Sequence, residues 1–363
     1  METSTARTSA PRAGTTWSAG VVITLVLASC APAAETSAQP GSSQPAAVST
    51  PSAAASERPS ASPRANADDI ATAVLTIHDG PDLPTAAFGS MWILAPDGDD
   101  NAVVRVDPAT DETIARISIG PSPCQALGAS DEAIWVCTPE GASRIDPATN
   151  AITGTVAYDV GTLRGQRMAF GAGAVWTLGS DGFEMTNLVR IDPVSEEATT
   201  FPLGHAAAGV AFGFDAVWIT ALDEGLLLRF EPATGEITEH ASGLVDPWIV
   251  IAGPDSLWVT LHGTAEARPE ADDPTVARVD PNDGTVIAEI ATGAGSGTSG
   301  SLWAEVDAVW VRAPDQFLVR IDPNTNEVVE RIDGPPTSGD VTVAFGSVWA
   351  TAVERQKVYR LAP

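Results

Sequence analysis

The sequence predicts an all-β protein whose folded part is one seven-bladed β-propeller, with four antiparallel strands in each blade. Three observations carry this prediction: a pattern that returns seven times at a period of about 42 residues, turn-forming residues between short β-rich runs, and no helical periodicity. A content of 44% apolar residues with 32 glycines and 28 prolines suits many short strands joined by tight turns.

The repeat is clearest in residues 210–232, where Ala-Phe-Gly, Ala-Val-Trp-Ile-Thr and Leu-Leu-Arg-Phe-Glu-Pro follow one another. Its tryptophans are Trp92, Trp135, Trp176, Trp218, Trp258, Trp310 and Trp349. Its arginines are Arg105, Arg144, Arg190, Arg229, Arg278 and Arg320, with a decayed copy at Arg360. One large aromatic residue at a constant strand position favours packing between blades over an aromatic binding cage.

Residues 1–29 have the organisation of a secretory signal peptide. Arg7 and Arg12 precede an apolar run at 19–27 that is too short to span a membrane comfortably, and Leu-Ala-Ser precedes Cys30. The segment resembles a bacterial lipoprotein signal, and the resemblance implies that cleavage leaves Cys30 as a lipid-modified N-terminus on the extracytoplasmic side of a membrane. The alternative is an ordinary signal or anchor that ends in cysteine by chance.

Residues 30–66 are rich in Ala, Ser and Pro and hold almost no large apolar side chain, so we expect a disordered tether. The propeller should occupy residues 67–363. Residues 68–80 resemble the outer strand of other repeats, whereas the chain ends at 358–361 with the strand that should precede it. Pairing these two segments would complete the seventh blade and remove the free edges.

The first hairpin of each repeat sets a strand register. Even changes in the length of its turn keep each side chain on the same face. Counting from the turns predicts that Trp92, Trp135, Trp176, Trp218 and Trp349 lie opposite Ala87, Ala126, Ala169, Ala211 and Ala344. The same count places Cys124 opposite Cys137, which in an exported domain predicts a cross-strand disulfide.

The Asp-Pro turns have a structural explanation, because proline fits the first corner of a type I turn and an aspartate oxygen accepts from the turn amides. We therefore expect turn caps, not ligands, at Asp107, Asp146, Asp192, Asp280 and Asp322.

The phrases Ala-Val-Trp-Ile-Thr and Arg-Ile-Asp-Pro-Asn-Thr-Asn-Glu-Val resemble the bacterial seven-bladed propellers called YncE-like or YVTN-repeat proteins. Residues 253–260, Gly-Pro-Asp-Ser-Leu-Trp-Val-Thr, also resemble the streptogramin B (virginiamycin B) lyase branch. The resemblance covers residues 68–363. It implies either a binding protein or a lyase that uses histidine, glutamate and a divalent metal on one propeller face.

A net charge of −28 argues against nucleic acid as a partner. We expect a monomer that touches the membrane through its N-terminal lipid alone and binds an unknown ligand or envelope protein.

Two sets of loops should meet on one face around the central channel, which is the default binding site of a propeller. They supply the candidate ligand-binding residues Arg164, Arg167, Asp246, Trp248 and Asp340, and the histidines His205 and His262. The same loops hold Asp82, Glu224 and Glu354, so a metal-assisted or acid–base site could form there.

The sequence thus favours a lipid-anchored propeller that binds a ligand or protein at its channel mouth. One alternative is a lyase-like eliminase using His205 or His262 and a divalent cation such as Mg²⁺ or Ca²⁺, whose ligands the sequence does not identify. Another is a structural scaffold of the cell envelope. No Ser-His-Asp, zinc, Walker or Rossmann pattern is present, so the sequence leans away from an enzyme.

Overall fold

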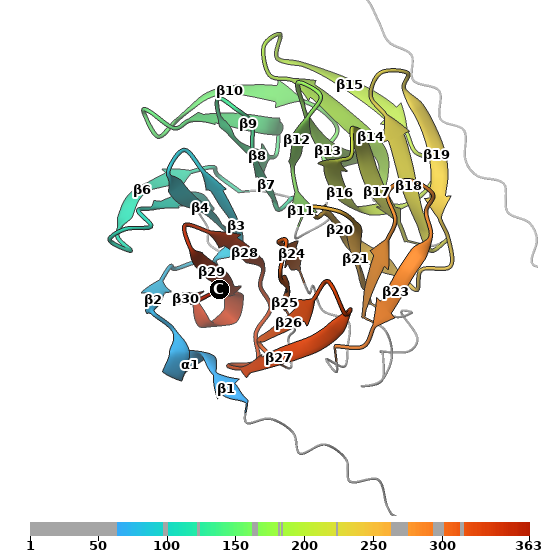
Figure 1. Cartoon of the computed structure of the whole chain (residues 1–363). Helices are drawn as coiled ribbons and strands as arrows, with labels where there is room; N and C mark the ends of the chain where they lie inside the picture. The colour runs from blue at the N-terminus through green and yellow to red at the C-terminus, as the bar shows by residue number, and fades with distance from the viewer. Residues whose placement is uncertain are drawn as a thin grey trace, which may run out of the picture. The chain divides into compact units, whose positions relative to one another are not determined.

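The computed structural model describes residues 64–96, 101–121, 124–161, 166–180, 182, 184–222, 224–262, 275–292, 301–312 and 316–363. All of them belong to one unit of the chain, Ser60–Pro363. Within this unit, seven mainly antiparallel sheets stand in a ring (Figure 1). The prediction of an all-β, seven-bladed propeller with four antiparallel strands per blade is confirmed.

The blades follow chain order, and the first strand of each lies nearest the centre (Figure 1). Blade 1 contains β3 (Asp82–Ala87), β4 (Ser90–Ala95), β5 (Ala102–Val106) and β6 (Thr113–Ser118); blade 2 contains β7 (Ala126–Ala129), β8 (Ile134–Thr138), β9 (Gly141–Asp146) and β10 (Ala151–Ala157); blade 3 contains β12 (Ala169–Gly171), β13 (Ala174–Ser180), β14 (Met185–Asp192) and β15 (Glu197–Pro202). Blade 4 contains β16 (Ala207–Gly213), β17 (Ala216–Ala221), β18 (Leu226–Glu231) and β19 (Glu236–Ala241); blade 5 contains β20 (Pro247–Ala252), β21 (Leu257–Leu261), β22 (Val276–Val279) and β23 (Val286–Ile290); blade 6 contains β24 (Leu302–Ala304), β25 (Val309–Arg312), β26 (Leu318–Asp322) and β27 (Glu327–Asp333). Blade 7 contains β28 (Val341–Ala344), β29 (Ser347–Ala352) and β30 (Lys357–Leu361), and a 3₁₀ turn, η1 (Val353–Arg355), joins the last two.

The outer strand of blade 7 is β2 (Ala73–Thr76), which comes from the N-terminal side of the propeller. It pairs antiparallel with β30, with Ala73 opposite Arg360 and Thr76 opposite Lys357. The two ends of the domain therefore close the ring as predicted. Closure leaves every blade flanked by two others, and the innermost strands contact one another around the whole ring.

The boundary of the tether needs a correction. Residues 68–80 were expected to be one strand, but α1 (Ala67–Ile70) precedes β2, and the Asn66 side chain caps this helix by accepting from the amide of Asp68. β1 (Ala65–Asn66), which we assigned to the tether, pairs in parallel with β27 of blade 6. Short segments of two to four residues carry too little periodicity to be recognised in a sequence.

The hydrophobic core consists of clusters between neighbouring blades. The blade tryptophans are 0–2% exposed and lie in these clusters. Between blades 3 and 4, for example, the ring of Trp176 lies 5.3 Å from that of Phe230. The packing role that the sequence predicts for the tryptophan row is confirmed.

The first hairpins have one uniform length, which corrects the predicted register in three blades. Ala169 and Ala211 do lie opposite Trp176 and Trp218. The partners of Trp92 and Trp349 are Thr85 and Thr342, two residues before the predicted Ala87 and Ala344. The partner of Trp135 is Gly128, two residues after the predicted Ala126. The predicted face survives this shift because strand side chains alternate with period two.

The cause of the error is the Phe-Gly pair. In blades 1 and 7 this pair, Phe88-Gly89 and Phe345-Gly346, is itself the two-residue turn, and all four residues have positive φ. In blade 3, Phe170-Gly171 belongs to the strand, and the turn follows at Ala172-Gly173. Turns of this handedness match the twist of the two strands, so they fix one hairpin length.

Cys124 and Cys137 are joined in a disulfide, with their Cα atoms 5.9 Å apart. They are not directly opposite, because Gly128 pairs with Trp135 and Leu127 with Val136. Cys124 lies before the start of β7, so the bond ties the entry of this inner strand to β8.

The Asp-Pro turns are built as the sequence predicts. The side chains of Asp107, Asp146, Asp192, Asp280 and Asp322 accept from amides two residues onward, at 2.7–2.9 Å. These hydrogen bonds lower the pKa of Asp146 and Asp192.

Some repeated arginines join one blade to the next. In blade 1, the guanidinium of Arg105 lies 4.8 Å from the ring centre of Trp92, and its Nε donates to Ser90 Oγ at 2.9 Å. Its Nη1 donates to the carbonyl of Pro147 at 2.6 Å and to Asn150 Oδ1 at 2.8 Å, both in the Asp-Pro turn of blade 2. We call this arrangement an arginine strap.

The strap recurs between blades 5 and 6 and between blades 7 and 1. It is formed by Arg278 with Ser256, Pro323 and Asn326, and by Arg360 with Ser347, Pro108 and Asp111. Each strap needs a serine two residues before the blade tryptophan. The other four blades have alanine there, at Ala133, Ala174, Ala216 and Ala308. Among the described residues their arginines make no such bridge, and the buried Nε atoms of Arg144 and Arg320 have no hydrogen-bond partner.

Exchanging this serine between neighbouring blades should change stability in opposite directions. Ser256→Ala leaves the Nε of Arg278 without its acceptor and should lower the free energy of unfolding by about 1–3 kcal/mol. Ala308→Ser offers an acceptor to Arg320 Nε and should raise it by up to about 1 kcal/mol. Denaturant unfolding of both variants measures the two changes, and shifts of the same sign would contradict the role of the serine.

Candidate functional site: the channel mouth

One position in each repeat lies at the same end of the central channel. It is nine residues before the blade tryptophan and within two residues of the start of the innermost strand, and we call the seven residues the mouth ring. They are Leu83, Ala126, Arg167, Gly209, Ile249, Ser301 and Asp340. Uniform hairpins keep these residues in equivalent places, so the three polar members, Arg167, Ser301 and Asp340, are brought together.

In blades 4 and 7, the two kinds of loop that we expected on this face contact each other. In blade 4, His205 Nδ1 lies 3.1 Å from Glu224 Oε2, which joins the loop before β16 to the loop after β17. In blade 7, Glu354 accepts from the amide of Ser338 at 2.8 Å, from the Ser338 hydroxyl at 2.7 Å and from the Thr337 hydroxyl. Burial opposes ionisation of Glu354, but these hydrogen bonds outweigh it and lower its pKa.

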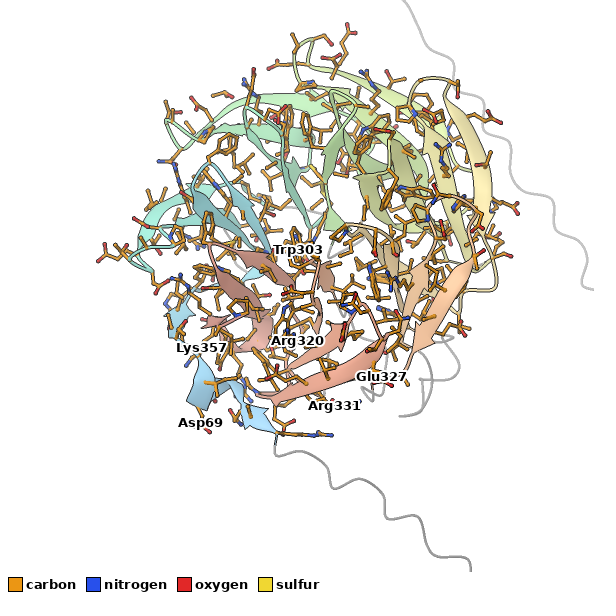
Figure 2. All side chains as sticks on the ribbon, in the orientation of Figure 1. Asp69, Trp303, Arg320, Glu327, Arg331 and Lys357 are labelled. Atoms are coloured by element: carbon orange, nitrogen blue, oxygen red, sulfur yellow. A yellow bond between two sulfur atoms is a disulfide. The ribbon has the colours of Figure 1, made fainter. Side chains whose placement is uncertain are left out.

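Arg167 reaches across the channel. It lies in β11 (Gln166–Arg167), which pairs in parallel with β7. Its Nη2 donates to Asp340 Oδ1 at 2.7 Å and to the carbonyl of Val341 at 2.9 Å, and its Nη1 donates to the carbonyl of Pro84 at 3.3 Å. The guanidinium also lies 5.3 Å from the ring centre of Trp303, which Figure 2 shows near the middle of the ring. One arginine thus touches blades 1, 6 and 7 from the side of blade 2.

The two carboxylate oxygens of Asp340 differ in the number of hydrogen bonds that they accept. Its Oδ1 accepts from Arg167, from the amide of Val341 at 2.6 Å and from the Ser301 hydroxyl. Its Oδ2 is buried and has no hydrogen-bond partner, and the whole residue is 2% exposed. A buried carboxylate oxygen without a donor is costly in a folded protein, so among the described residues this atom is the strongest sign of a binding position.

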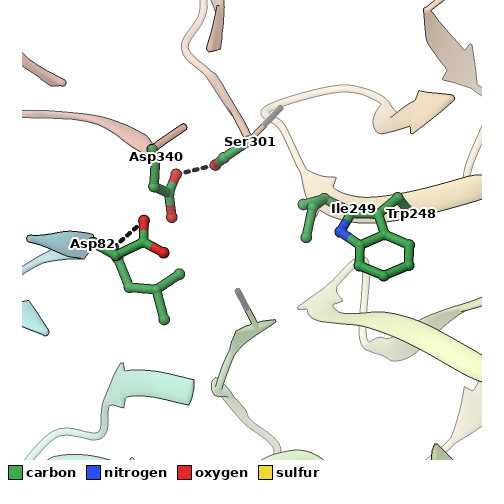
Figure 3. A pocket seen from close by; sticks show the side chains of 7 residues that line it. Asp82, Trp248, Ile249, Ser301 and Asp340 are labelled. Atoms are coloured by element: carbon green, nitrogen blue, oxygen red, sulfur yellow. Dashed lines mark hydrogen bonds between the residues drawn. The ribbon is translucent and has the colours of Figure 1, made fainter. Parts of the chain in front are cut away.

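Asp82 lies beside Asp340 at the mouth (Figure 3). Its carboxylate accepts from the amide of Leu83 at 3.0 Å. Burial, and then the nearby charge of Asp340, raise the pKa of Asp82 to about 7, although the Leu83 amide, Arg167 and Arg312 act in the opposite direction. About half of the Asp82 carboxyl groups therefore carry a proton at pH 7.

Asp82 should make stability depend on pH. Because its pKa rises from 3.8 in the unfolded chain to about 7 in the folded protein, the folded state binds this proton more tightly, and the resulting stability is lost as the pH rises from about 4 to 7. This loss amounts to a few kcal/mol in the free energy of unfolding between pH 4 and pH 7, at about 1.4 kcal/mol per pKa unit, and Asp82→Asn should abolish it. Urea unfolding of both proteins at pH 4, 5.5 and 7 gives the difference, and parallel curves would contradict it.

Arg312 is a second buried cation near these carboxylates. Two residues after the tryptophan, blades 4, 5 and 7 have Thr220, Thr260 and Thr351, whose hydroxyls bind the backbone of the inner strands, whereas blade 6 has Arg312. Its guanidinium donates to the carbonyls of Thr351 at 3.1 Å, Phe317 at 2.5 Å and Thr337 at 3.0 Å. Burial lowers its pKa to about 10, so it stays charged at neutral pH.

A small cavity of about 20 Å³ opens at this place. It is lined by Asp82, Leu83, Trp248, Ile249, Ser301, Gly339 and Asp340. Figure 3 shows the carboxylates on one side and Ile249 and Trp248 on the other. The volume suffices for one water-sized group.

Trp248 lines one wall of the mouth, and His262 stacks on it. Their rings are stacked, with 5.0 Å between the centres and 19° between the planes. Burial lowers the pKa of His262 to about 4, so this wall is uncharged at neutral pH. The backbone amide of His262 donates to the carbonyl of Asp246, and the imidazole Nε2 has no hydrogen-bond partner.

The predicted site residues divide into three groups. Arg167, Trp248 and Asp340 belong to the mouth, and His262 stacks on Trp248. His205 contacts Glu224 within blade 4, and the carbonyl of Asp246 accepts from the amide of His262 within blade 5. Among the described residues, no contact joins His205 to His262. Arg164 and Cys30 lie outside the described residues. Sequence reasoning missed Ser301, Arg312 and Trp303; the column nine residues before each tryptophan would have found Ser301.

Within the described ranges, no group of three or more histidine, cysteine or acidic side chains is arranged to hold a metal ion. In the same part of the chain, no helix is long and apolar enough to cross a membrane.

No family model matches the chain, and no curated protein matches it. Several solved structures, however, have a similar fold. The chain is similar to Kuenenia stuttgartiensis hydrazine synthase (TM-score 0.62, 12% identity, 79% of this chain and 96% of that one) and to the computationally designed Ika8 protein (0.57, 13%, 81% and 100%). It is also similar to the Neurospora crassa Pan2 WD40 domain (0.56, 10%, 78% and 88%). At these identities the likeness supports the propeller fold alone.

Proposed function

We propose that this protein is an extracytoplasmic binding protein, held at a membrane by a lipid on Cys30, whose propeller binds a ligand at the channel mouth. The observation that carries the binding role is Asp340 Oδ2, a buried acceptor without a donor beside the cavity at the channel mouth. A ligand group that donates to this atom would remove an unfavourable feature of the unbound protein.

The rest of the mouth supports this proposal. Arg167 holds Asp340 in place by an ion pair, and Arg312 fixes the nearby backbone by donating to three carbonyl groups, so the site does not have to be organised when the ligand arrives. Trp248 offers a rigid aromatic surface because His262 is stacked behind it. The YncE-like repeat, which the sequence resembles, is consistent with a binding role.

A fragment screen tests the binding role. With 5-fluorotryptophan in the protein, ligands of the mouth should shift the ¹⁹F resonance that Trp248→Phe removes. Asp340→Asn should weaken these ligands about tenfold or more, since hydrogen bonds to charged groups contribute about 1.5–3 kcal/mol. The control is Asp79→Asn, which changes a carboxylate paired with Arg116 elsewhere. A complete screen in which no compound moves the Trp248 signal would refute the binding role.

Membrane attachment is tested separately. Cells that express the full chain should incorporate labelled fatty acid into the protein, and Cys30→Ser should abolish this labelling and release the protein from the membrane fraction. Labelling that persists in Cys30→Ser would show that Cys30 is not the modified residue.

The lyase-like eliminase remains a second prediction. His262 supports it in one respect, because a neutral imidazole with an unpartnered Nε2 can act as a base or metal ligand. Turnover of a streptogramin B antibiotic that requires Mg²⁺ and is lost in His262→Ala would establish it.

A further inference from the structure

We propose that the group bound at the channel mouth is the ammonium group of a primary amine. This inference rests on the binding role proposed above and names the chemical class of its ligand. It follows from the hydrogen-bonding needs of the mouth, the size of the cavity, its walls and its charge.

One carboxylate oxygen at the mouth, Asp340 Oδ2, lacks a hydrogen-bond donor. Asp340 Oδ1 already accepts three hydrogen bonds, from Arg167, Ser301 and Val341, whereas Oδ2 accepts none and is shielded from solvent. A carboxylate or phosphate ligand brings acceptors only and would place a second anion beside Oδ2. The structure therefore selects a ligand group that carries hydrogen atoms on nitrogen or oxygen.

The size of the cavity narrows the choice. About 20 Å³ accommodates one water-sized head group, such as –NH₃⁺ or –OH, and the pocket is partly open, so the rest of the ligand can extend out of it. An ammonium group has three donors and no acceptor. The three side chains that offer oxygens here, Asp82, Ser301 and Asp340, match this number, whereas a hydroxyl has one donor to offer.

The remaining walls suit the carbon chain of an amine. Leu83 and Ile249 are apolar, and the Trp248 ring can attract a cation through its π face. His262, behind that ring, is neutral above about pH 4 and does not repel the ligand. The net charge of −28 raises the local concentration of cations around the protein.

Charge also distinguishes an amine from a divalent metal. Ca²⁺ and Mg²⁺ need six or more oxygen ligands, and the Arg167 guanidinium lies 2.7 Å from Asp340 Oδ1. A single positive charge that keeps its own hydrogen atoms can use the one free oxygen of Asp340 and the carboxylate of Asp82.

Binding should release a proton. Asp82 is about half protonated near pH 7, and its carboxyl proton competes with the ligand for the space between the two aspartates. The balance is R–NH₃⁺ plus Asp82–COOH giving the complex of R–NH₃⁺ with Asp82–COO⁻ and one H⁺. The affinity should therefore rise about tenfold per pH unit below pH 7 and level off above it.

The experiment uses n-butylammonium, n-butanol, n-butyrate and Ca²⁺ as probes, with the purified propeller in calorimetry and in ¹⁹F NMR of the Trp248 signal. Butylammonium should bind at least tenfold more tightly than butanol, and butyrate and Ca²⁺ should leave Trp248 unmoved. Heats measured at pH 7 in buffers with different ionisation enthalpies should reveal the released proton. Asp82→Asn and Asp340→Asn should each weaken butylammonium tenfold or more, whereas Asp79→Asn should not.

Loss of Asp340 also removes contacts with Arg167, so two further variants protect the test. Ser301→Ala keeps both carboxylates and should weaken butylammonium several-fold, and Ile249→Phe should block it by filling the cavity. If butyrate or Ca²⁺ moves Trp248 and butylammonium does not, the mouth still binds ligands but the amine proposal is wrong. If butylammonium binds equally to Asp340→Asn and Ile249→Phe, its site lies elsewhere and the amine proposal is also wrong.

Discussion

A protein that lacks residues 70–77 should unfold less cooperatively and at a lower temperature than the full propeller. The deletion removes β2, so β30 becomes an unpaired edge in a blade of three strands. It also removes the buried side chains of Leu75 and Ile77, each of which contributes about 1.5–3 kcal/mol by burial. An exposed edge strand additionally promotes pairing with another molecule. Calorimetry and light scattering during heating measure both effects.

The matched control for ring closure is deletion of residues 31–61, which lie before β1. This variant should melt at the temperature of the parent protein. Equal melting temperatures for the two deletions would show that the ring does not depend on its N-terminal strand.

Arg312→Met should cause the largest loss of stability among single substitutions at the mouth, about 3–5 kcal/mol, the cost typical of leaving buried charged partners unpaired. Arg312 is 1% exposed, and its guanidinium donates to three carbonyl groups of blades 6 and 7, whose oxygens would lose their donor. Asp82 and Asp340 would also lose a neighbouring positive charge, so the pKa of Asp82 should rise further.

Chemical denaturation compares this variant with Arg64→Met, which removes an arginine that is 46% exposed and lies 3.4 Å from Asp333. The control should change stability by less than about 1 kcal/mol, as is usual for surface ion pairs. A loss in Arg312→Met no larger than in the control would mean that its hydrogen bonds contribute little.

Much of the fold could be predicted because its signal is repeated seven times. Trp218 and its counterparts mark the second strand of every blade. Ring closure could be predicted because residues 68–80 resemble an outer strand, whereas the last repeat lacks one. The exact pairing could not be predicted with the same success, because Phe-Gly is a turn in blades 1 and 7 and part of a strand in blade 3. A two-residue shift in the position of the turn leaves each side chain on the same face of the sheet but changes the residue that lies opposite it on the neighbouring strand.

The site was harder to predict, because a sequence does not show which loops converge. Arg167 and Asp340 were selected as isolated polar residues, yet they are 173 positions apart and form one ion pair. His205 and His262 were selected for their chemistry, but His205 contacts Glu224 and His262 is stacked on Trp248. Arg312 looked like part of an ordinary strand, since burial of a charge leaves no mark in the local sequence.

The arginine straps make the ring mechanically uneven. They join blades 7, 1 and 2 to one another and blade 5 to blade 6, whereas the other four seams have no strap among the described residues. The two seams on either side of blade 1, next to the blade that the two chain ends complete, should therefore resist separation more than the seams without a strap. A force or a partner that widens the channel would separate the blades at the seams without a strap first and leave the closure intact.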